Sequence, residues 1–445
     1  MYTIILILLS IVFIVVISTR FKVHPFLSLL AAAFLYGLFS GMPLGQIIET
    51  INEGFGGTIE KIGIIIIAGI IIGAFLENSG GAYALANKIL SLVGKKRVHT
   101  AMAFIGYIVS VPVFADSGFV ILSSLNRAIT KNAKLSLAGT AIALALGLTA
   151  THTMVPPTPG PIAAAGIIGA DLGLVILLGL FVSLCGLIVS ILFAKYIGKK
   201  IFIDPTLSSE QEKNKKIIED APSAMKSFLP IVIPIVLIVL RSVAEFPTHP
   251  FGDGKVRILL GFVGNPVAAL FVGVLISFFL PRKFDKEMLS TTGWVGKALK
   301  TAAIIILITG AGGAFGKVLQ SSDLGTILGE NICGTSLGIW LPFLLAAAIK
   351  TAQGSSTVAI ITTASIVAPL LQIMGLDSDI SKAMVVISIG AGSAVVSHAN
   401  DSFFWVVTQM SDMNLKQGYR IQTLGTAVLG FSAMIFLTIL SLFFG

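Results

Sequence analysis

Long apolar runs separated by short polar segments dominate the chain. Such runs occupy residues 2–19, 25–42, 62–78, 135–152, 228–245, 256–281 and 421–444. An apolar run of about 20 residues can span the hydrocarbon core of a bilayer, which is about 30 Å thick. Inside lipid the backbone must satisfy its own hydrogen bonds, so these runs form helices. The pattern therefore predicts an all-α integral membrane protein.

The composition narrows the functional class. Charged residues make up 11% of the 445 residues and the mean hydropathy is +0.98, whereas a soluble domain carries about 25% charged residues. The formal net charge of +9 would suit nucleic-acid binding if the basic residues formed one stripe. They lie instead in short loops between apolar runs, where they indicate topology. We therefore expect the lipid bilayer as a partner and no nucleic acid.

The basic loops orient the chain through the positive-inside rule. Arg20 and Lys22 directly follow the first apolar run. That run lacks a basic start and a small-residue cleavage site, so we expect a retained helix rather than a signal peptide. Placing both the amino and the carboxyl terminus outside puts most lysines and arginines on the cytoplasmic side. It also puts the loop with Glu49 and Glu53, after the second apolar run, outside.

Two apolar segments have flanks that a spanning helix cannot have. Residues 101–122 begin after one basic cluster and end before another, so both ends face the cytoplasm. We predict a re-entrant hairpin with its tip near residues 112–118, because proline, glycine and short polar residues interrupt helices. Residues 336–374 start and finish outside as a second hairpin. Polar breaks also interrupt segments 135–170 and 383–410, which we expect to be broken helices.

The two halves of the chain resemble each other. Both carry two glycines four residues apart, followed by a short polar motif: Gly69, Gly73 and ENS at 77–79, then Gly312, Gly316 and QSS at 320–322. We divide the chain into a first repeat at 1–196, a cytoplasmic linker at 197–226 and a second repeat at 227–445. Each repeat has five spans plus one hairpin, and the odd number of spans inverts the second repeat. Inverted repeats with interrupted helices at corresponding places indicate a secondary transporter.

The four interruptions are expected to meet near the middle of the membrane, at the repeat interface. Half-helix amino termini present unpaired N–H groups to an anion, hydroxyl and amide side chains bond hydroxyl groups, and glycine lets the backbone approach a ligand. This chemistry suits a small hydroxylated carboxylate. The predicted substrate-binding residues are Ser117, Gly118, Thr151, Thr158, Gly160, Gln353, Gly354, Ser355, Ser356, Thr357, Asn400 and Ser402.

Ionisable side chains in these interruptions are candidates for proton coupling, because intramembrane charges are costly and usually functional. The candidates are Asp116, His152, His398 and Asp401. Each has a structural alternative: either histidine can simply bond a backbone carbonyl, and Asp401 can cap the short helix that follows it. Lys350 is the basic group of this zone, and can pair with an acid or attract the anion.

These residues resemble the gluconate permease (GntP) family of the ion-transporter superfamily, over essentially the whole chain. The resemblance rests on FADSGFVIL from Phe114, THTMVPPTPGP from Thr151, KTAQGSSTVAIITTA from Lys350 and SHANDSFFW from Ser397. It implies proton-driven uptake of gluconate or a related sugar acid across a bacterial inner membrane. It also implies a homodimer in which a transport domain, carrying the hairpins, moves as an elevator against a scaffold domain.

Two positions depart from the gluconate-type pattern. Asp116 stands where gluconate carriers tend to have Glu, and Thr158 stands where a His is common. The substrate could therefore be another hydroxy acid, such as glycerate. Sodium coupling and a D-amino acid substrate similar to D-serine remain alternatives. A channel is a further alternative. So is an intramembrane enzyme, although the sequence has no identifiable nucleophile or metal-ligand set. We expect no enzymatic activity, no cofactor and no resident metal.

Overall fold

The computed structural model describes residues 2–94, 97–205, 221–245, 251, 254–321, 338–399 and 401–444. The helices of the first half are α1 (Tyr2–Thr19), α2 (Pro25–Phe39), α3 (Leu44–Asn78), α4 (Gly81–Val93), α5 (Val98–Val109), α6 (Ala115–Asn132), α7 (Leu137–Met154), α8 (Pro159–Ile168) and α9 (Leu172–Lys200). Those of the second half are α11 (Ala224–Ala244), α12 (Lys255–Val263), α13 (Pro266–Ser277), α14 (Trp294–Ser321), α16 (Trp340–Gln353), α17 (Ser356–Val367), α18 (Asp379–Ala394), α19 (Ser402–Met410), α20 (Leu415–Gly418) and α21 (Leu424–Phe444). Short 3-10 turns lie at Lys286–Leu289 and Ala368–Leu370, and a π-helical turn, η3, lies at Tyr419–Thr423.

Several of these helices are long enough to span a membrane. Six helical stretches of the described chain are long and apolar enough to cross a bilayer, and the bent pair α12–α13 raises the number to seven. Within the described ranges all regular structure is helical. The predicted class, an all-helical membrane protein, agrees with this architecture.

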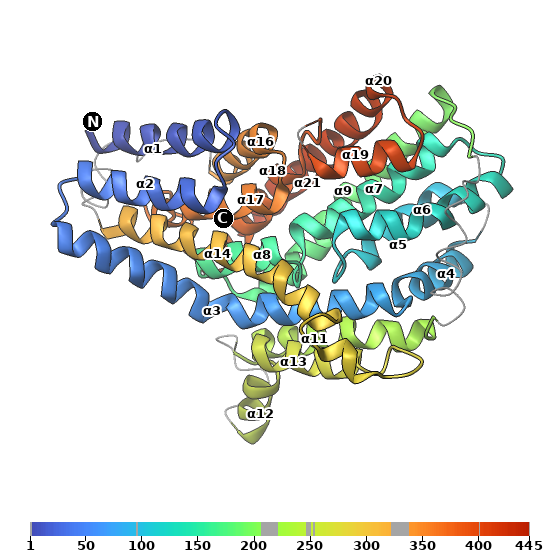
Figure 1. Cartoon of the computed structure of the whole chain (residues 1–445), viewed down its shortest axis with the longest axis horizontal. Helices are drawn as coiled ribbons and strands as arrows, with labels where there is room; N and C mark the ends of the chain where they lie inside the picture. The colour runs from blue at the N-terminus through green and yellow to red at the C-terminus, as the bar shows by residue number, and fades with distance from the viewer. Residues whose placement is uncertain are drawn as a thin grey trace.

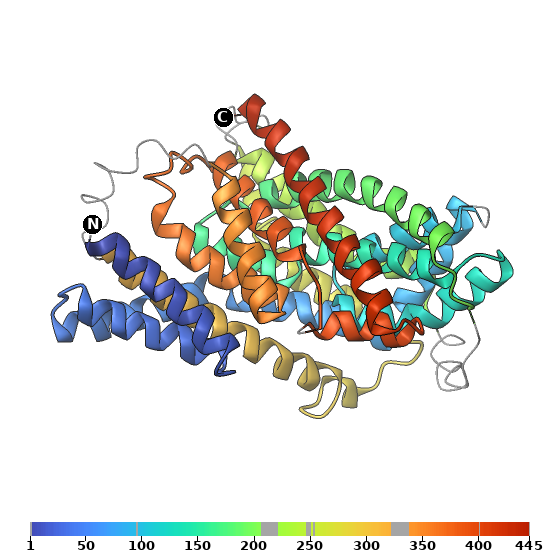
Figure 2. The ribbon, with the colours of Figure 1, turned by 90° about the horizontal axis from the view of Figure 1, so that it is seen from above.

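Helices α1, α2, α3 and α14 run side by side along one part of the molecule (Figure 1), with α14 in contact with both α2 and α3. Helices α5 to α9 and α16 to α21 form the rest of the body. Figure 2 shows α21 crossing this second part obliquely, where it contacts α9 and α18. Helix α12 projects from the body in Figure 1 and buries none of its residues.

Glycines let α3 and α14 pack backbone to backbone. A Cβ added at Gly54 would lie 2.6 Å from the carbonyl oxygen of Gly313, and one added at Gly313 would lie 2.7 Å from that of Gly54. Small residues at such crossings allow membrane helices to approach closely. The Lys317 ammonium also lies 3.0 Å from Oε1 of Glu53 across the same pair.

The prediction for the start of α3 was wrong. We expected a span at 62–78 and an external loop carrying Glu49 and Glu53, yet the helix is continuous from Leu44. Its first turns bury Ile47, Thr50, Ile51 and Gly54 and leave both glutamates exposed. Hydropathy averages over both faces of a helix, so it underestimates an amphipathic beginning such as this one.

The expected span at 256–281 is broken rather than formed by one straight helix. It consists of α12 and α13, bent by 62° with respect to each other. The bend lies at Asn265 and Pro266, where the Asn265 side chain accepts a hydrogen bond of 3.0 Å from the Val267 amide. Proline suits the first turn of a helix because it has no N–H to leave unpaired, so the sequence starts a new helix at this point.

The end of the first hairpin and the start of the linker differ from the expected boundaries. The second arm of the first hairpin runs to Asn132 rather than to residue 122, because α6 is amphipathic and its helix outlasts its apolar run. The expected linker 197–226 begins at Ile201, since α9 continues to Lys200. Ile203 then hydrogen-bonds the start of α7: its carbonyl accepts from the Leu137 amide at 2.9 Å and its amide donates to Ser136 Oγ at 3.0 Å. Residues 206–220 of the linker and residues 336–337 of the second hairpin lie outside the described residues.

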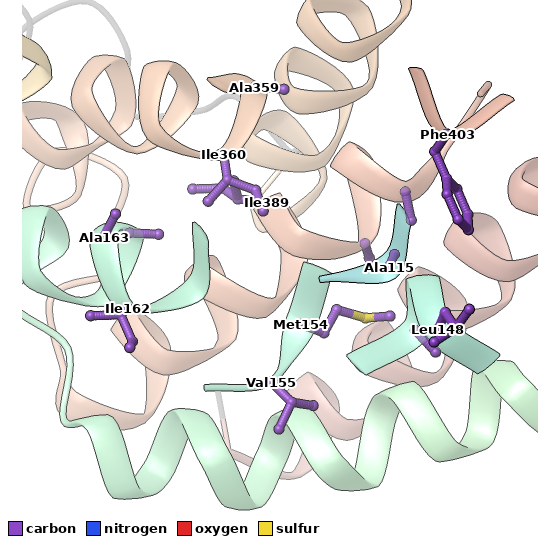
Figure 3. Close-up of a cluster of buried hydrophobic side chains, with 14 of the residues drawn as sticks. Ala115, Leu148, Met154, Val155, Ile162, Ala163, Ala359, Ile360, Ile389 and Phe403 are labelled. Carbon is purple, nitrogen blue, oxygen red and sulfur yellow. The ribbon is translucent and has the colours of Figure 1, made fainter. Parts of the chain in front are cut away.

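Four helix pairs are interrupted in the regions where breaks were expected. The pairs are α5–α6, α7–α8, α16–α17 and α18–α19, with breaks at 110–114, 155–158, 354–355 and 395–401. Buried hydrophobic side chains join these pairs. Figure 3 shows ten labelled residues of this cluster, contributed by α6, α7, α8, α17, α18 and α19, and by Val155 in the α7–α8 break. The cluster fixes the broken ends relative to one another.

Candidate functional site

A cavity of about 280 Å³ lies among three of the four breaks. It is lined by residues from the amino-terminal ends of α6, α17 and α19, from α7 and α16, and from α18 and α21. Nine residues predicted as functional line it: Asp116, His152, Gln353, Gly354, Ser355, Ser356, Thr357, Asp401 and Ser402. The structure therefore brings the two hairpins and the α18–α19 break to one place.

Three helix amino termini border the cavity. Asp116 lies in the first turn of α6, Ser356 and Thr357 in that of α17, and Ser402 in that of α19. The first turns of a helix carry unpaired N–H groups and a partial positive charge equivalent to about half an elementary charge. The arrangement favours an anionic group in the cavity.

Helices α6 and α19 are joined at both ends. At the cavity the Ser402 hydroxyl donates to Oδ1 of Asp116 at 3.3 Å, and the rings of Phe119 and Phe403 lie 6.1 Å apart. At the far end Arg127 donates to Oδ2 of Asp412 at 2.7 Å. The same guanidinium donates to the carbonyl oxygen of Met410 at 2.6 Å. Both helices thus point their amino termini at the cavity.

Lys350 is buried beside the cavity, with 2% of its side chain exposed. Its ammonium donates to Oδ2 of Asp401 at 2.6 Å and also to the carbonyl oxygen of Gly354. Gly354 ends α16 with φ of +83°, a left-handed conformation that glycine adopts without strain. One side chain therefore connects α16, the turn of the second hairpin and the α18–α19 break.

Asp401 is fully engaged by protein groups. Besides Lys350 it accepts from the Ser397 hydroxyl at 2.6 Å and from the Phe403 amide at 3.0 Å, the second bond being a cap of α19. Asp116 has a weaker environment, in which its side chain accepts a hydrogen bond from the neutral hydroxyl of Ser402. Of the described lining residues, Lys350 is the cation, and Asp116 and Asp401 are the anions.

Within the described part of the chain, two polar groups at the cavity have no protein partner. Neither the nitrogen nor the oxygen of the Gln353 side-chain amide makes a hydrogen bond, although both atoms are buried. Nδ1 of His152 is in the same condition. The His152 ring lies 5.8 Å from that of Phe114, another lining residue.

Six predicted site residues lie outside the lining and bond or pack against protein groups. The Thr151 hydroxyl donates to the carbonyl of Tyr107 at 2.8 Å and that of Thr158 to the carbonyl of Val155 at 2.6 Å. Nε2 of His398 lies 2.8 Å from the carbonyl oxygen of Thr351. Ser117 hydrogen-bonds Glu77. A Cβ added at Gly118 would lie 2.8 Å from Leu148, and one added at Gly160 would lie 2.9 Å from Ile360. Asn400 lies outside the described residues.

The sequence reasoning missed several lining residues. Thr149 precedes His152 by three positions on α7, so helical spacing could have placed it on the same face. Thr426 comes from α21, and its hydroxyl accepts from the Ser397 amide at 3.0 Å. No signal in the sequence connects a threonine in that apolar run to the breaks.

Comparisons with known proteins identify relatives of the chain. The model of the family described as GntP family permease matches residues 2–443. A gluconate permease of Pseudomonas aeruginosa is 34% identical, over 98% of this chain and 96% of its own. The D-serine transporter DsdX of Escherichia coli is 33% identical, over 95% and 94%. The crystal structure of the YdaH transporter of Alcanivorax borkumensis has a similar fold, with a TM-score of 0.62, 15% identity and coverage of 90% and 89%.

Proposed function

The chain belongs to the GntP family of permeases, and from that premise we propose that it is a proton-coupled symporter of gluconate or a related small hydroxylated monocarboxylate. The family and the relatives are permeases, so the chain is a multi-pass membrane transporter and not an enzyme. The direction of transport proposed is into the cytoplasm, across the inner membrane, with both termini outside.

The charges of the cavity support proton coupling. Lys350 is neutralised by Asp401 at 2.6 Å, and Asp116 adds a negative charge that no cation in the described lining contacts directly. A carboxylate substrate entering beside an ionised Asp116 would meet a like charge in a low-dielectric site, which is strongly unfavourable. Protonation of Asp116 removes that repulsion. Binding of the anion and of one proton is therefore linked.

The order of the helices supports inverted repeats and an elevator. In each half a long helix (α3 or α14) precedes a hairpin, a broken helix and a further long helix (α9 or α21). The glycine contact makes α3 and α14 candidates for the scaffold domain. Both hairpins and the α18–α19 break border the cavity, so the hairpins and broken helices form the candidate transport domain. A homodimer built on the scaffold completes this proposal.

Uptake by purified protein in proteoliposomes tests the function. Radiolabelled gluconate should accumulate when the inside is alkaline, an uncoupler should abolish the accumulation, and replacement of sodium by choline should leave it unchanged. Accumulation that survives the uncoupler and requires sodium would instead support sodium coupling.

A D-amino acid is the second candidate substrate, favoured by the same Asp116. The ammonium group of a zwitterion could pair with that carboxylate directly, with no proton required. Thermal stabilisation of the purified protein by D-serine and not by gluconate would select this candidate, because a ligand that binds the folded state raises its unfolding temperature.

A further inference from the structure

The unpartnered amide of Gln353 points to a ligand group. Buried polar side-chain atoms almost always have a hydrogen-bond partner. Other polar side chains around the cavity follow this rule: Ser356 donates to the carbonyl of Ser393 at 2.9 Å, and Thr149 to that of Ala145 at 2.9 Å. Gln353 satisfies neither its donor nor its acceptor, and Nδ1 of His152 is likewise unsatisfied. Both residues line the same cavity.

The hydrogen-bonding capacity of the Gln353 amide and the His152 imidazole indicates which ligand group would bond to both. A primary amide offers both donors and an acceptor, and a neutral imidazole offers one of each. A carboxylate only accepts and an ammonium only donates, so neither satisfies the amide fully. A hydroxyl group both donates and accepts, which matches the pair.

The position of Gln353 indicates where this hydroxyl group lies relative to the carboxylate of the substrate. Gln353 follows Lys350 by three residues on α16, and residues at that spacing lie on one face of a helix. A ligand whose carboxylate lies near the helix amino termini around Lys350 would therefore present a nearby carbon to the Gln353 amide.

We propose that Gln353 and His152 bind a hydroxyl group close to the carboxylate of the transported acid, and so select hydroxylated acids over their deoxy analogues. This proposal rests on the proposed function as a carboxylate transporter. Sites that hydrogen-bond a substrate hydroxyl discriminate well against analogues lacking it, because the protein groups are then left unpaired.

Competition in proteoliposomes tests the proposal. The uptake of radiolabelled gluconate is measured against increasing 2-deoxygluconate, 3-deoxygluconate or unlabelled gluconate. In the unsubstituted protein at least one deoxy acid should compete about tenfold to a hundredfold less well than gluconate. In Gln353→Leu and in His152→Leu that ratio should fall towards one, chiefly through weaker competition by gluconate. Gln353→Glu supplies a second variant, with an ionised side chain that only accepts, if the leucine variant does not fold.

Gln422 provides the matched control. It is also buried with neither amide atom bonded, but it lies in η3 and does not line the cavity. Gln422→Leu should leave the selectivity ratio unchanged. Equal competition by both deoxy acids and gluconate, or a ratio unaltered in the Gln353 variants, would overturn the proposal while transport of gluconate still supports the function. Absence of uptake of any hydroxy acid by folded protein would instead overturn the proposed function.

Discussion

The ammonium nitrogen of Lys350 lies 2.6 Å from Oδ2 of Asp401, 51 positions away in the chain, with both side chains almost completely buried. The pair joins the second hairpin to the α18–α19 break at the edge of the cavity. Because Asp401 also accepts two further hydrogen bonds, we interpret it as the fixed partner of Lys350. Asp116 is then the better candidate for the group that exchanges a proton.

Lys350→Met and Asp401→Asn should each destabilise the protein. Removing one partner of a buried ion pair leaves the other charge uncompensated and costs about 3–5 kcal/mol. The double variant should lose less than the sum of the two single losses, since the interaction can be lost only once. Thermal unfolding in detergent measures this. The exposed pair Arg241 and Glu245, 2.9 Å apart, is the control: its loss should cost less than about 1 kcal/mol. Additive losses for Lys350 and Asp401 would contradict this account.

Asp116→Asn should reduce gradient-driven accumulation of substrate more than exchange of substrate across the membrane. The asparagine side chain cannot take up a proton, so the variant can bind and move the acid but cannot link it to the pH gradient. Counterflow at equal pH on both sides supplies the internal control for folding and binding. Undiminished accumulation would remove Asp116 from the coupling role.

Arg127→Ala should lower stability and also weaken substrate affinity. The guanidinium bonds both Asp412 and the carbonyl of Met410, and hydrogen bonds to charged groups contribute about 1.5–3 kcal/mol each. Arg127→Lys should restore only part of the loss, because an ammonium lacks the planar fork of donors. Lys131→Ala, at an exposed position of the same helix, should be neutral. Half-saturation equal to that of the unsubstituted protein in Arg127→Ala would show that the far ends of α6 and α19 do not position the cavity.

Gly54→Ala and Gly56→Ala should have opposite effects on stability. A methyl group at Gly54 would lie within 3 Å of atoms of α14, including backbone atoms of Gly313 and Ala314, whereas one at Gly56 meets nothing within 4 Å. Forcing the helices apart typically costs about 1–3 kcal/mol. At Gly56 alanine should stabilise the helix by about 0.5–1 kcal/mol. The unfolding temperatures of the two variants, compared with that of the unsubstituted protein, test this prediction. An unchanged unfolding temperature in Gly54→Ala would argue against close packing of α3 and α14.

The sequence predicted the breaks well because breaks have local causes. Proline at 112, 156, 157 and 159 and glycine at 354 interrupt apolar runs that would otherwise continue as helices. Three of the four breaks meet at one cavity, whereas the residues of the α7–α8 break itself, 155–158, do not line it. The role of Lys350 as partner of an acid was also among the sequence-based alternatives, since a lone buried cation needs an opposite charge.

The sequence could not show which polar residue of each break faces the cavity. At the α7–α8 break the hydroxyls of Thr151 and Thr158 bond nearby carbonyls, while His152 between them lines the cavity. The broken backbone leaves carbonyl groups that need donors, and local geometry decides which side chain supplies them. The basic cluster that follows residue 122 was expected to mark a cytoplasmic flank, but its Arg127 lies within α6 and is buried.

The volume of the cavity, about 280 Å³, decides how transport by this protein can be followed in practice. Pockets for small molecules usually measure about 300–1,000 Å³, so this one leaves little space beyond a six-carbon acid. A dye attached to the cargo would not fit within this volume. Isotopic labelling is therefore the appropriate tracer, and a negative result with a fluorescent conjugate would carry no information about selectivity.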